Sequence, residues 1–276
     1  MNFLKAEINA GAEKPFDIIH ISDTHLSLAD SRDSERKIKL AERRRTGFPE
    51  AEEMLQETKR LAELTGNTVI HTGDLIDFVS EANLDRAKKF TSEVDCFAAA
   101  GNHEFSLYVG EAKEDAAYRQ QSLAHVSESF TNDIRFASRV INGINFVALD
   151  NSYYLIEPFQ LDALKKEVAK GLPVILCVHT PLYTKELFDY VTAGHEKGYP
   201  AYLMSVPEDR IKYYPPDRYE QQREDATTRE AYEYIKNESG IKAILAGHVH
   251  TDFAFDFFSR PQLGVGCTDI RTVTIL

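Results

Sequence analysis

The sequence predicts an α/β fold, because strand-like and helix-like segments alternate through the first two thirds of its 276 residues. Its composition is that of a globular protein, with 43% hydrophobic residues for a core and 28% charged residues for a solvated surface. The length suits one large domain, so we expect a single domain over residues 1–276. No apolar run is long enough to cross a bilayer, so we expect no membrane partner.

The first half of the chain predicts strands that each end in a polar loop, with helices between them. Residues 16–26 (FDIIHISDTHL) begin as an apolar strand and continue into polar residues. Residues 49–64 space their apolar side chains as a helix does, after Pro49, which suits a first helical turn. The same patterns predict strands within 67–77 and 95–105 and a helix over 81–93.

The second half continues the alternation around one irregular segment. Asn142-Gly143 divides the apolar runs of 134–152 and is typical of a tight hairpin turn. Residues 182–224 are rich in Tyr, Pro and charge, so we expect a surface insertion that caps the domain. The remaining predictions are a helix over 159–171 that stops at Gly171, a strand within 172–181, a helix near 225–239, a strand that begins at 241, and antiparallel strands in 251–276 with turns at Arg260-Pro261 and Gly264.

Side chains that bind metals follow the predicted strands in five places: Asp23 and His25, Asp74 and Asp77, Asn102 and His103, His179, and His248 and His250. Open α/β sheets bind ligands beyond the carboxyl ends of their strands, so these loops are expected to converge. A glycine precedes a candidate ligand in three of the loops, at Gly73, Gly101 and Gly247. At such positions the chain turns sharply or the backbone approaches a neighbour closely.

The repetition of these strand ends predicts a metal site. A single aspartate after a strand is usually a helix cap or a turn residue, but capping does not explain five successive ends. The set is too large for one ion that keeps an open position, so two ions that share a carboxylate are predicted. Nitrogen and oxygen donors without thiolate favour Mn, Fe, Zn, Ni or Co. The candidate ligands are Asp23, His25, Asp74, Asn102, His179, His248 and His250.

These residues resemble the signature of the calcineurin-like metallophosphoesterases. The family's blocks D-x-H, G-D-x-x-D, G-N-H-[DE], a lone His, and G-H-x-H match Asp23/His25, Gly73-Asp74/Asp77, Gly101-Asn102-His103-Glu104, His179, and Gly247-His248/His250. All five blocks stand in order and span residues 23–250. The resemblance implies a four-layer α-β-β-α sandwich of mixed sheets and a dinuclear metal centre.

The resemblance also implies a role for each residue. Asp23, His25 and His250 would hold the first ion, Asn102, His179 and His248 would hold the second, and Asp74 would bridge them. Asp77 and Glu104 would support the ligands from behind. His103 would face the substrate as a phosphate contact or a general acid. The implied reaction is hydrolysis of a phosphoester by in-line attack of a hydroxide that bridges the two ions.

The sequence favours a small phosphoester as the substrate. Asp77 is followed by FVSEAN, without the arginine that protein Ser/Thr phosphatases carry there, and it replaces the tyrosine of purple acid phosphatases. The formal net charge of −12 disfavours nucleic acid as a partner. We expect a phosphodiesterase or broad phosphatase for small phosphorylated or nucleotide substrates. The alternatives are a nuclease of the same fold and a non-catalytic interaction scaffold.

Two segments near the predicted site each have two interpretations. Six of the ten residues from Arg36 to Arg45 are Lys or Arg, so residues 31–45 form a solvated helix face or a basic cap for anionic substrates. The tyrosines of the 182–224 segment stack on a nucleobase or cover a sheet edge. These tyrosines are Tyr183, Tyr199, Tyr202, Tyr213, Tyr214 and Tyr219.

The other histidines and the cysteines are expected to have no part in metal binding. His20, His71, His125 and His195 lie outside every motif. Cys96, Cys177 and Cys267 have apolar neighbours in the sequence, which predicts reduced, buried thiols. The first residues lack the basic start and apolar stretch of a secretory signal, so we expect a cytoplasmic protein.

Overall fold

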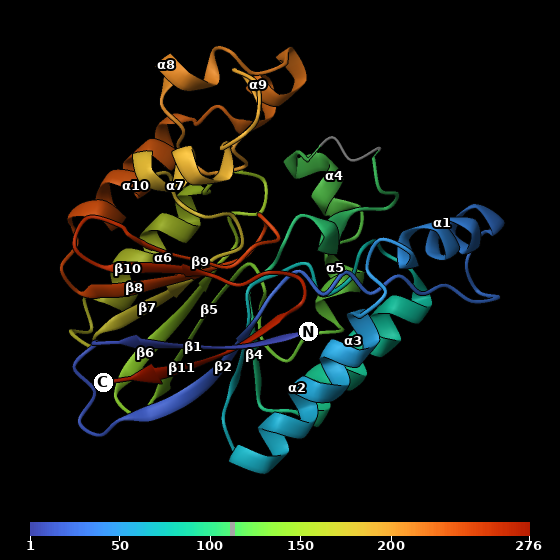
Figure 1. Ribbon diagram of the computed structural model, residues 1–276, viewed down its shortest axis with the longest axis horizontal. Coiled ribbons are helices and arrows are strands. Elements are labelled where there is room, and N and C mark those ends of the chain that lie inside the picture. Colours follow the sequence, from blue (N-terminus) through green and yellow to red (C-terminus); the bar gives the residue numbers. More distant parts are fainter. Residues whose placement is uncertain (111–113) are drawn as a thin grey trace.

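The first of two mixed β-sheets carries the N-terminal strands. The computed structural model describes residues 1–110 and 114–276 (Figure 1). The strand order in this sheet is β1 (Asn2–Ile8), β11 (Asp269–Ile275), β2 (Phe16–Ile21), β3 (Val69–His71) and β4 (Cys96–Ala98). Because β2, β3 and β4 are parallel, the loops that follow them leave the sheet at one edge.

The second sheet has the order β5 (Phe136–Ile141), β6 (Ile144–Leu149), β7 (Val174–Cys177), β8 (Ile241–Ala246), β10 (Pro261–Gly264) and β9 (Phe253–Asp256). Its four inner strands, β6, β7, β8 and β10, are parallel, whereas β5 and β9 pair antiparallel at the two edges. The loops after β6, β7 and β8 therefore also share one edge.

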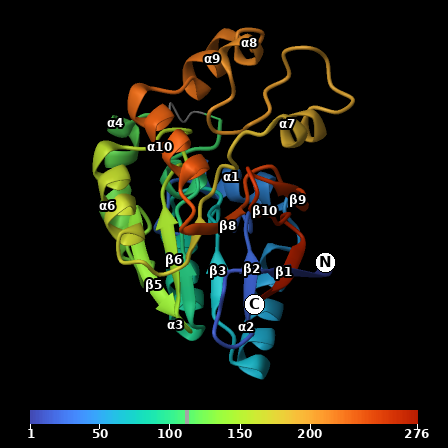
Figure 2. The same cartoon turned by 90° about the vertical axis from the view of Figure 1, so that its left-hand side faces the viewer.

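A continuous apolar core joins the two sheets, and helices cover their outer faces (Figure 2). Between the sheets, Ile70 and Phe97 of the first pack in one cluster with Phe146 and Ile175 of the second. Helices α2 (Ala51–Thr65) and α3 (Glu81–Glu93) bury their apolar faces on the first sheet, and α6 (Pro158–Val168) and α10 (Ala226–Asn237) on the second. The predicted four-layer α-β-β-α sandwich is confirmed.

Shorter helices lie around the loops that follow the strands. These are α1 (Glu35–Arg45), the 3-10 helix η1 (His103–Phe105), α4 (Ala116–Gln120), α5 (Leu123–Ser127), α7 (Lys185–Val191), α8 (Glu208–Ile211) and α9 (Pro216–Gln222). In Figure 1, α8 and α9 stand above the second sheet and α1 projects on the opposite side of the molecule. No helix among the described residues is both long and apolar enough to cross a membrane.

Most of the predicted elements occur where the sequence patterns indicate. The helix expected over 49–64 is α2, and α3 occupies 81–93. The hairpin of β5 and β6 turns at Asn142 and Gly143, whose φ angles of 48° and 84° are those of a type I′ turn. Gly171, with φ 80°, follows α6 and stops it as expected.

The prediction for the C-terminal segment was partly wrong. β9 and β10 form the expected antiparallel pair, but the turn between them occupies residues 257–260, and Pro261 already belongs to β10. After Gly264 the chain crosses to the other sheet, where β11 pairs antiparallel with β2 and parallel with β1. An alternating pattern specifies a strand but not its partner, and β1 at the N-terminus was not predicted at all.

Two further expectations need correction, those for the 182–224 segment and for Cys267. The 182–224 segment is not irregular throughout, because it contains the short helices α7, α8 and α9. Residues 35–45 form a helix, α1, as one of the two interpretations expected, and Ser34 caps it by accepting a hydrogen bond from the Lys37 amide. Cys96 and Cys177 are buried free thiols as expected, but Cys267 is only half-buried, in the turn before β11.

Candidate metal centre

The loops that carry the candidate ligands approach one another so closely that only glycine fits at three positions. A Cβ atom on Gly101 would lie 2.2 Å from Asp74 Oδ1, and one on Gly247 would lie 1.9 Å from Ser22 Oγ. Gly73 has a φ of 97°, and a Cβ there would lie 2.6 Å from the Gly101 amide nitrogen. The glycines thus allow loops from both sheets to meet, as the sequence pattern indicated.

Gly101→Ala is expected to lower metal affinity at least about tenfold, because the new methyl group must displace Asp74 or its loop. Gly66→Ala is the matched control, since Gly66 has a φ of 72° but no atom within 4 Å of an added Cβ. The control should lose about 1 kcal/mol of unfolding free energy and keep wild-type metal affinity. Calorimetric titration with Mn(II) measures both variants, and wild-type affinity in Gly101→Ala would contradict this account.

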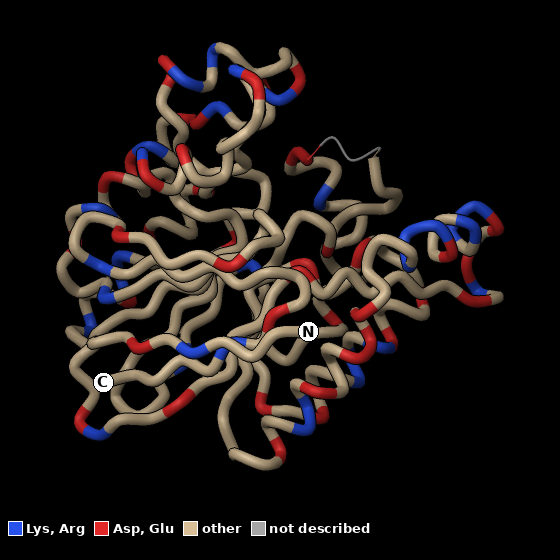
Figure 3. The backbone as a smooth tube through the Cα atoms, viewed as in Figure 1, with Lys and Arg blue, Asp and Glu red and all other residues tan. Residues whose placement is uncertain are grey.

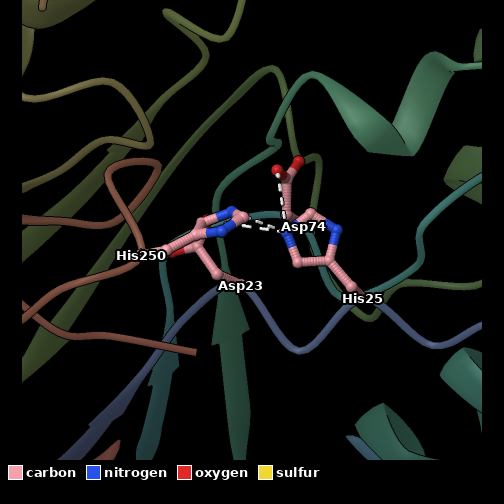
Figure 4. A group of neighbouring side chains, drawn as sticks. All are labelled: Asp23, His25, Asp74 and His250. Carbon is pink, nitrogen blue, oxygen red and sulfur yellow. Dashed lines mark hydrogen bonds and ion pairs between the residues drawn. The ribbon is translucent and has the colours of Figure 1, made fainter. Parts of the chain in front are cut away.

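The first group of candidate ligands consists of Asp23, His25, Asp74 and His250 (Figure 4). Their ligand atoms lie within 4.8 Å of one another, and the side chains point toward a common centre. His25 Nε2 is 3.0 Å from His250 Nε2 and 3.6 Å from Asp74 Oδ2. The side chains of His25 and Asp23 are fully buried, whereas that of His250 is 40% exposed, which leaves this group one open side.

The second group consists of Asp74, His179 and His248. His179 Nε2 lies 3.0 Å from His248 Nδ1 and 3.2 Å from Asp74 Oδ2. Asp74 therefore belongs to both groups through the same oxygen, while its Oδ1 accepts a hydrogen bond from the His103 amide. The structure thus brings His25 and His250 together in one group and His179 and His248 together in the other.

Hydrogen bonds on the far side of each ring direct lone pairs into the centre. His25 Nδ1 donates to Asp77 Oδ1, and His179 Nδ1 donates to the Thr72 carbonyl at 2.8 Å. Burial lowers the pKa of His25, so its neutral ring carries the lone pair on Nε2. Burial also lowers the pKa of His179, but the charge of Asp74 outweighs this effect and raises it to about 9, so without a cation Nε2 holds a proton toward Asp74 Oδ2. A bound cation would take the place of that proton and accept both lone pairs, so the donor set fits metal ions.

Asn102 supplies a second sign that the centre fits a metal. Its amide Nδ2 donates to Glu114 Oε1 at 3.0 Å, which fixes the orientation of the amide. Its Oδ1 is buried and has no hydrogen-bond partner among the residues that the structure describes. A buried carbonyl oxygen without a partner is costly, and coordination of a cation would satisfy it.

The backbone is strained at the same residues. Five candidate ligands have a positive φ, a region that residues other than glycine seldom occupy: Asp23 at 52°, His25 at 52°, Asp74 at 57°, His248 at 70° and His250 at 54°. Each such residue costs on the order of 1 kcal/mol. Strain repeated at converging polar side chains is typical of a functional site.

Asp77 links the first group of ligands to helix α1. Its buried carboxylate accepts from His25 and, in a bidentate pair, from Arg44 Nε at 2.6 Å and Nη2 at 2.8 Å. Burial alone would raise the pKa of Asp77, but the hydrogen bonds from Arg44, His103 and His25 hold it well below its usual range. An ionised Asp77 keeps His25 in the tautomer that presents Nε2 to the centre.

His103 lies beside the ligand groups and lines an adjoining cavity. Its Nδ1 donates to the Asp77 carbonyl at 2.7 Å, so Nε2 is the ring nitrogen left for other contacts. Burial lowers the pKa of His103, but the charges of Asp74 and Asp77 outweigh this effect and raise it to about 10. The ring also forms a third cluster with His25 and Asp77, an alternative group for one ion.

Glu104 joins the loop that carries Asp74 to the loop that carries Gly101. Its carboxylate accepts from the backbone amides of Asp74 and Gly101 at 2.8 and 2.6 Å, and from that of Leu75 at 2.7 Å. Burial and the charge of Asp74 raise the pKa of Glu104 to about 7. This position agrees with the supporting role expected for Glu104, since it fixes the Asp74 loop without facing the centre.

Residues that the motifs do not include also contact the candidate ligands. The Tyr154 hydroxyl lies 2.7 Å from His248 Nε2, and Asn151 Oδ1 accepts from the His179 amide. Both follow β6, whose polar ending DNSYY was a signal of the same kind as the other strand ends. Glu114, which holds Asn102, had no such signal in the sequence.

The four histidines expected to be non-ligands lie outside the three clusters found among the described residues. His20 is buried against Thr72 Oγ1, and His71 is buried against Thr24 Oγ1. Burial lowers the pKa of both rings, that of His71 to about 3, so both are neutral packing residues. His125 pairs with Glu81, and His195 stacks on Tyr199.

A cavity of about 510 Å³ opens directly onto the candidate ligands. Its walls come from both segments that the sequence left with two interpretations: Arg44 from α1, and Tyr199, Tyr202 and Arg218 from the 182–224 segment. Figure 3 shows the basic residues along α1, and Arg36, Lys39, Arg43 and Arg45 among them are exposed. The helix is thus mainly a solvated face, from which Arg44 reaches the site.

Comparison with known proteins identifies the family. Residues 16–252 match the family model of calcineurin-like phosphoesterases. A dimetal phosphatase from Danio rerio has a similar structure, with a TM-score of 0.50 and 13% identity over 91% of this chain and 88% of that one. No curated protein sequence matches.

Two further solved structures are more distant. A phosphopantetheinyl hydrolase from Mycobacterium tuberculosis has a TM-score of 0.45 and 12% identity over 90% of this chain and 89% of that one. A candidate 5′-nucleotidase from Staphylococcus aureus, in complex with alpha-ketoglutarate, has a TM-score of 0.45 and 12% identity. The match covers 92% of this chain but only 49% of that protein, so this chain spans about half its length.

The family match extends over most of the chain and includes all five strand ends described above. The two mixed sheets with helices on both sides have the architecture of the dimetal phosphatase. The protein belongs to the calcineurin-like phosphoesterase family.

Proposed function

We propose that the protein hydrolyses small phosphoesters with two transition-metal ions bound at the candidate metal centre. Asp23, His25 and His250 would hold one ion, and Asn102, His179 and His248 the other. The observation that carries this proposal is the position of Asp74, whose Oδ2 lies 3.6 Å from His25 Nε2 and 3.2 Å from His179 Nε2. One carboxylate oxygen between two imidazole groups suits a bridging ligand.

The donor set favours ions that accept both nitrogen and oxygen. The three clusters of the described residues consist of Asp and His, without cysteine. We therefore propose Mn, Fe, Zn, Ni or Co rather than the all-oxygen sites of Mg or Ca. When bound, such ions would lower the pKa of a water molecule and neutralise charge on the phosphoryl group.

The chain's own residues would position the substrate and move a proton. The charges of Asp74 and Asp77 raise the pKa of His103 and favour its protonated form, while its Nδ1–H remains bonded to the Asp77 carbonyl. Nε2–H is then able to donate to a phosphoryl oxygen or to protonate the departing alkoxide. The 182–224 segment would act as a cap, because Tyr202 and Arg218 line the cavity over the centre.

Metal restoration tests the proposal. Protein stripped with a chelator should hydrolyse neither p-nitrophenyl phosphate nor bis(p-nitrophenyl) phosphate, and Mn(II) should restore hydrolysis of at least one of them. The ratio of the two rates distinguishes a phosphomonoesterase from a phosphodiesterase, which we propose as the two candidate activities. If none of the five metals restores turnover of either ester, the proposal fails and the scaffold alternative is favoured.

A further inference from the structure

The cavity beside the metal centre is larger than a phosphate group requires. Its volume of about 510 Å³ is in the range of pockets that enclose whole organic ligands. Asp74, Asn102, His103, His248 and His250 line part of it. Glu114 and residues of the 182–224 segment line it as well, so a phosphoester bound at the centre would place the rest of its structure beside them.

Aromatic rings lead from the metal centre along one wall of the cavity. The Tyr202 ring lies 5.9 Å from the His248 ring, edge to face. The Tyr199 ring lies 6.3 Å from the Tyr202 ring in the same arrangement. His195 stacks on Tyr199 at 3.7 Å and backs this wall. Tyr214, by contrast, is buried and is bonded to the Ala201 amide, so it supports the segment instead of lining the cavity.

A cation completes the aromatic wall. The Arg218 guanidinium lies 5.8 Å from the centre of the Tyr202 ring, and its Nη1 donates to Gln221 Oε1 at 2.6 Å. Tyrosine rings beside a guanidinium form a surface on which planar, electron-rich rings stack. This composition is unlike the purely charged lining that would suit inorganic phosphate alone.

Glu114 supplies an acceptor on the same cavity. One carboxylate oxygen, Oε1, accepts from Asn102, but Oε2 is buried and no described residue offers it a hydrogen bond. An unprotonated phosphate oxygen cannot satisfy Oε2 of an ionised Glu114, because both atoms are then acceptors. A hydroxyl or amine group of a ligand can satisfy it, and a buried carboxylate strongly favours ligands that carry such a donor.

We propose that the substrate is a phosphoester of a nucleoside, with its base against Tyr199 and Tyr202 and a hydrogen-bond donor of the nucleoside on Glu114. This inference rests on the proposed function, because the phosphate must reach the metal centre for the nucleoside to enter the cavity. The donor is a ribose hydroxyl or an amine of the base, since both have the chemistry that Glu114 requires.

Direct binding tests the inference without depending on turnover. The probes are non-hydrolysable phosphonates of adenosine and of ribose, in which a methylene group replaces the ester oxygen, titrated calorimetrically into the Mn(II)-loaded protein. The adenosine compound should bind at least about tenfold more tightly, because base stacking on an aromatic ring contributes to its affinity alone. Equal affinities would overturn the inference.

Two variants locate the effect. Tyr202→Leu should remove the adenosine preference and leave the affinity for the ribose compound unchanged. Tyr213→Leu is the control, because Tyr213 is an exposed tyrosine of the same segment that does not line this cavity, and it should keep the preference. If Tyr202→Leu weakens both probes equally, the aromatic wall does not select the base and the inference fails.

Three further probes identify the donor to Glu114. The 2′-deoxyadenosine and 3′-deoxyadenosine compounds each lack one ribose hydroxyl, and the inosine compound lacks the amine, so one of the three should bind about tenfold more weakly than adenosine. In Glu114→Gln, which keeps the acceptor for Asn102, that difference should disappear. If all three analogues bind as adenosine does, Glu114 makes no such contact. Failure to hydrolyse any ester would refute the proposed function separately.

Discussion

Asp74→Asn is expected to reduce the rate of metal-dependent phosphoester hydrolysis at least about a hundredfold. Removal of one electrostatic group at a reacting centre typically lowers kcat by at least this factor. The reason is visible in the contacts of the carboxylate. Oδ1 accepts a hydrogen bond from the His103 amide at 2.8 Å, and the side-chain oxygen of an asparagine would accept the same bond. The amide NH₂ would then replace Oδ2 and present hydrogen atoms toward His25 and His179, where a cation must lie.

Calorimetric titration with Mn(II) separates this effect from a general loss of structure. The wild-type protein should bind two ions, and Asp74→Asn should lose at least one of them. Asp95→Asn is the matched control: Asp95 is a half-exposed aspartate directly before β4, and its carboxylate accepts hydrogen bonds from Thr68 Oγ1 and Arg139 Nη2. It should bind metal and hydrolyse substrate as the wild type does. Two ions bound with unchanged affinity in Asp74→Asn would refute the bridging role.

The ligand groups were predictable because parallel strands impose a simple rule. β2, β3 and β4 run the same way, as do β7 and β8, so a polar residue just after each strand lies at a shared edge. The glycines at 73 and 101 narrow the possibilities further, since each marks a close approach that a side chain would block. Local sequence is sufficient here, because each ligand follows its strand within a few residues.

The cavity walls were not predictable by the same rule. Arg44, Glu114, Tyr202 and Arg218 lie on helices and loops whose positions depend on contacts distant in sequence, such as the Arg44–Asp77 pair. The sequence of residues 36–45 indicated a basic segment, but not which of its arginines points toward the metal centre. The crossing of β11 into the first sheet was not predicted for a related reason, since the partner of a strand depends on which strands lie beside it in space.

His103→Asn is expected to lower kcat by about 10²- to 10⁴-fold, the usual contribution of a general acid, while metal affinity stays unchanged. Asparagine is able to donate a hydrogen bond to the Asp77 carbonyl as Nδ1–H does, but it cannot carry the proton of the imidazolium. His125→Asn, at an exposed histidine paired with Glu81, should change neither quantity. A fall in metal affinity in His103→Asn would instead favour the cluster of His103 with His25 and Asp77 as an ion site.

The leaving group then decides between the two roles open to His103. A p-nitrophenolate departs without protonation, whereas the more basic phenolate of a phenyl ester needs a proton as the bond breaks. If His103 acts as a general acid, the loss in His103→Asn should be at least about tenfold greater for the phenyl ester than for the p-nitrophenyl ester. If it binds a phosphoryl oxygen, both esters should lose activity equally, because that oxygen is the same in each.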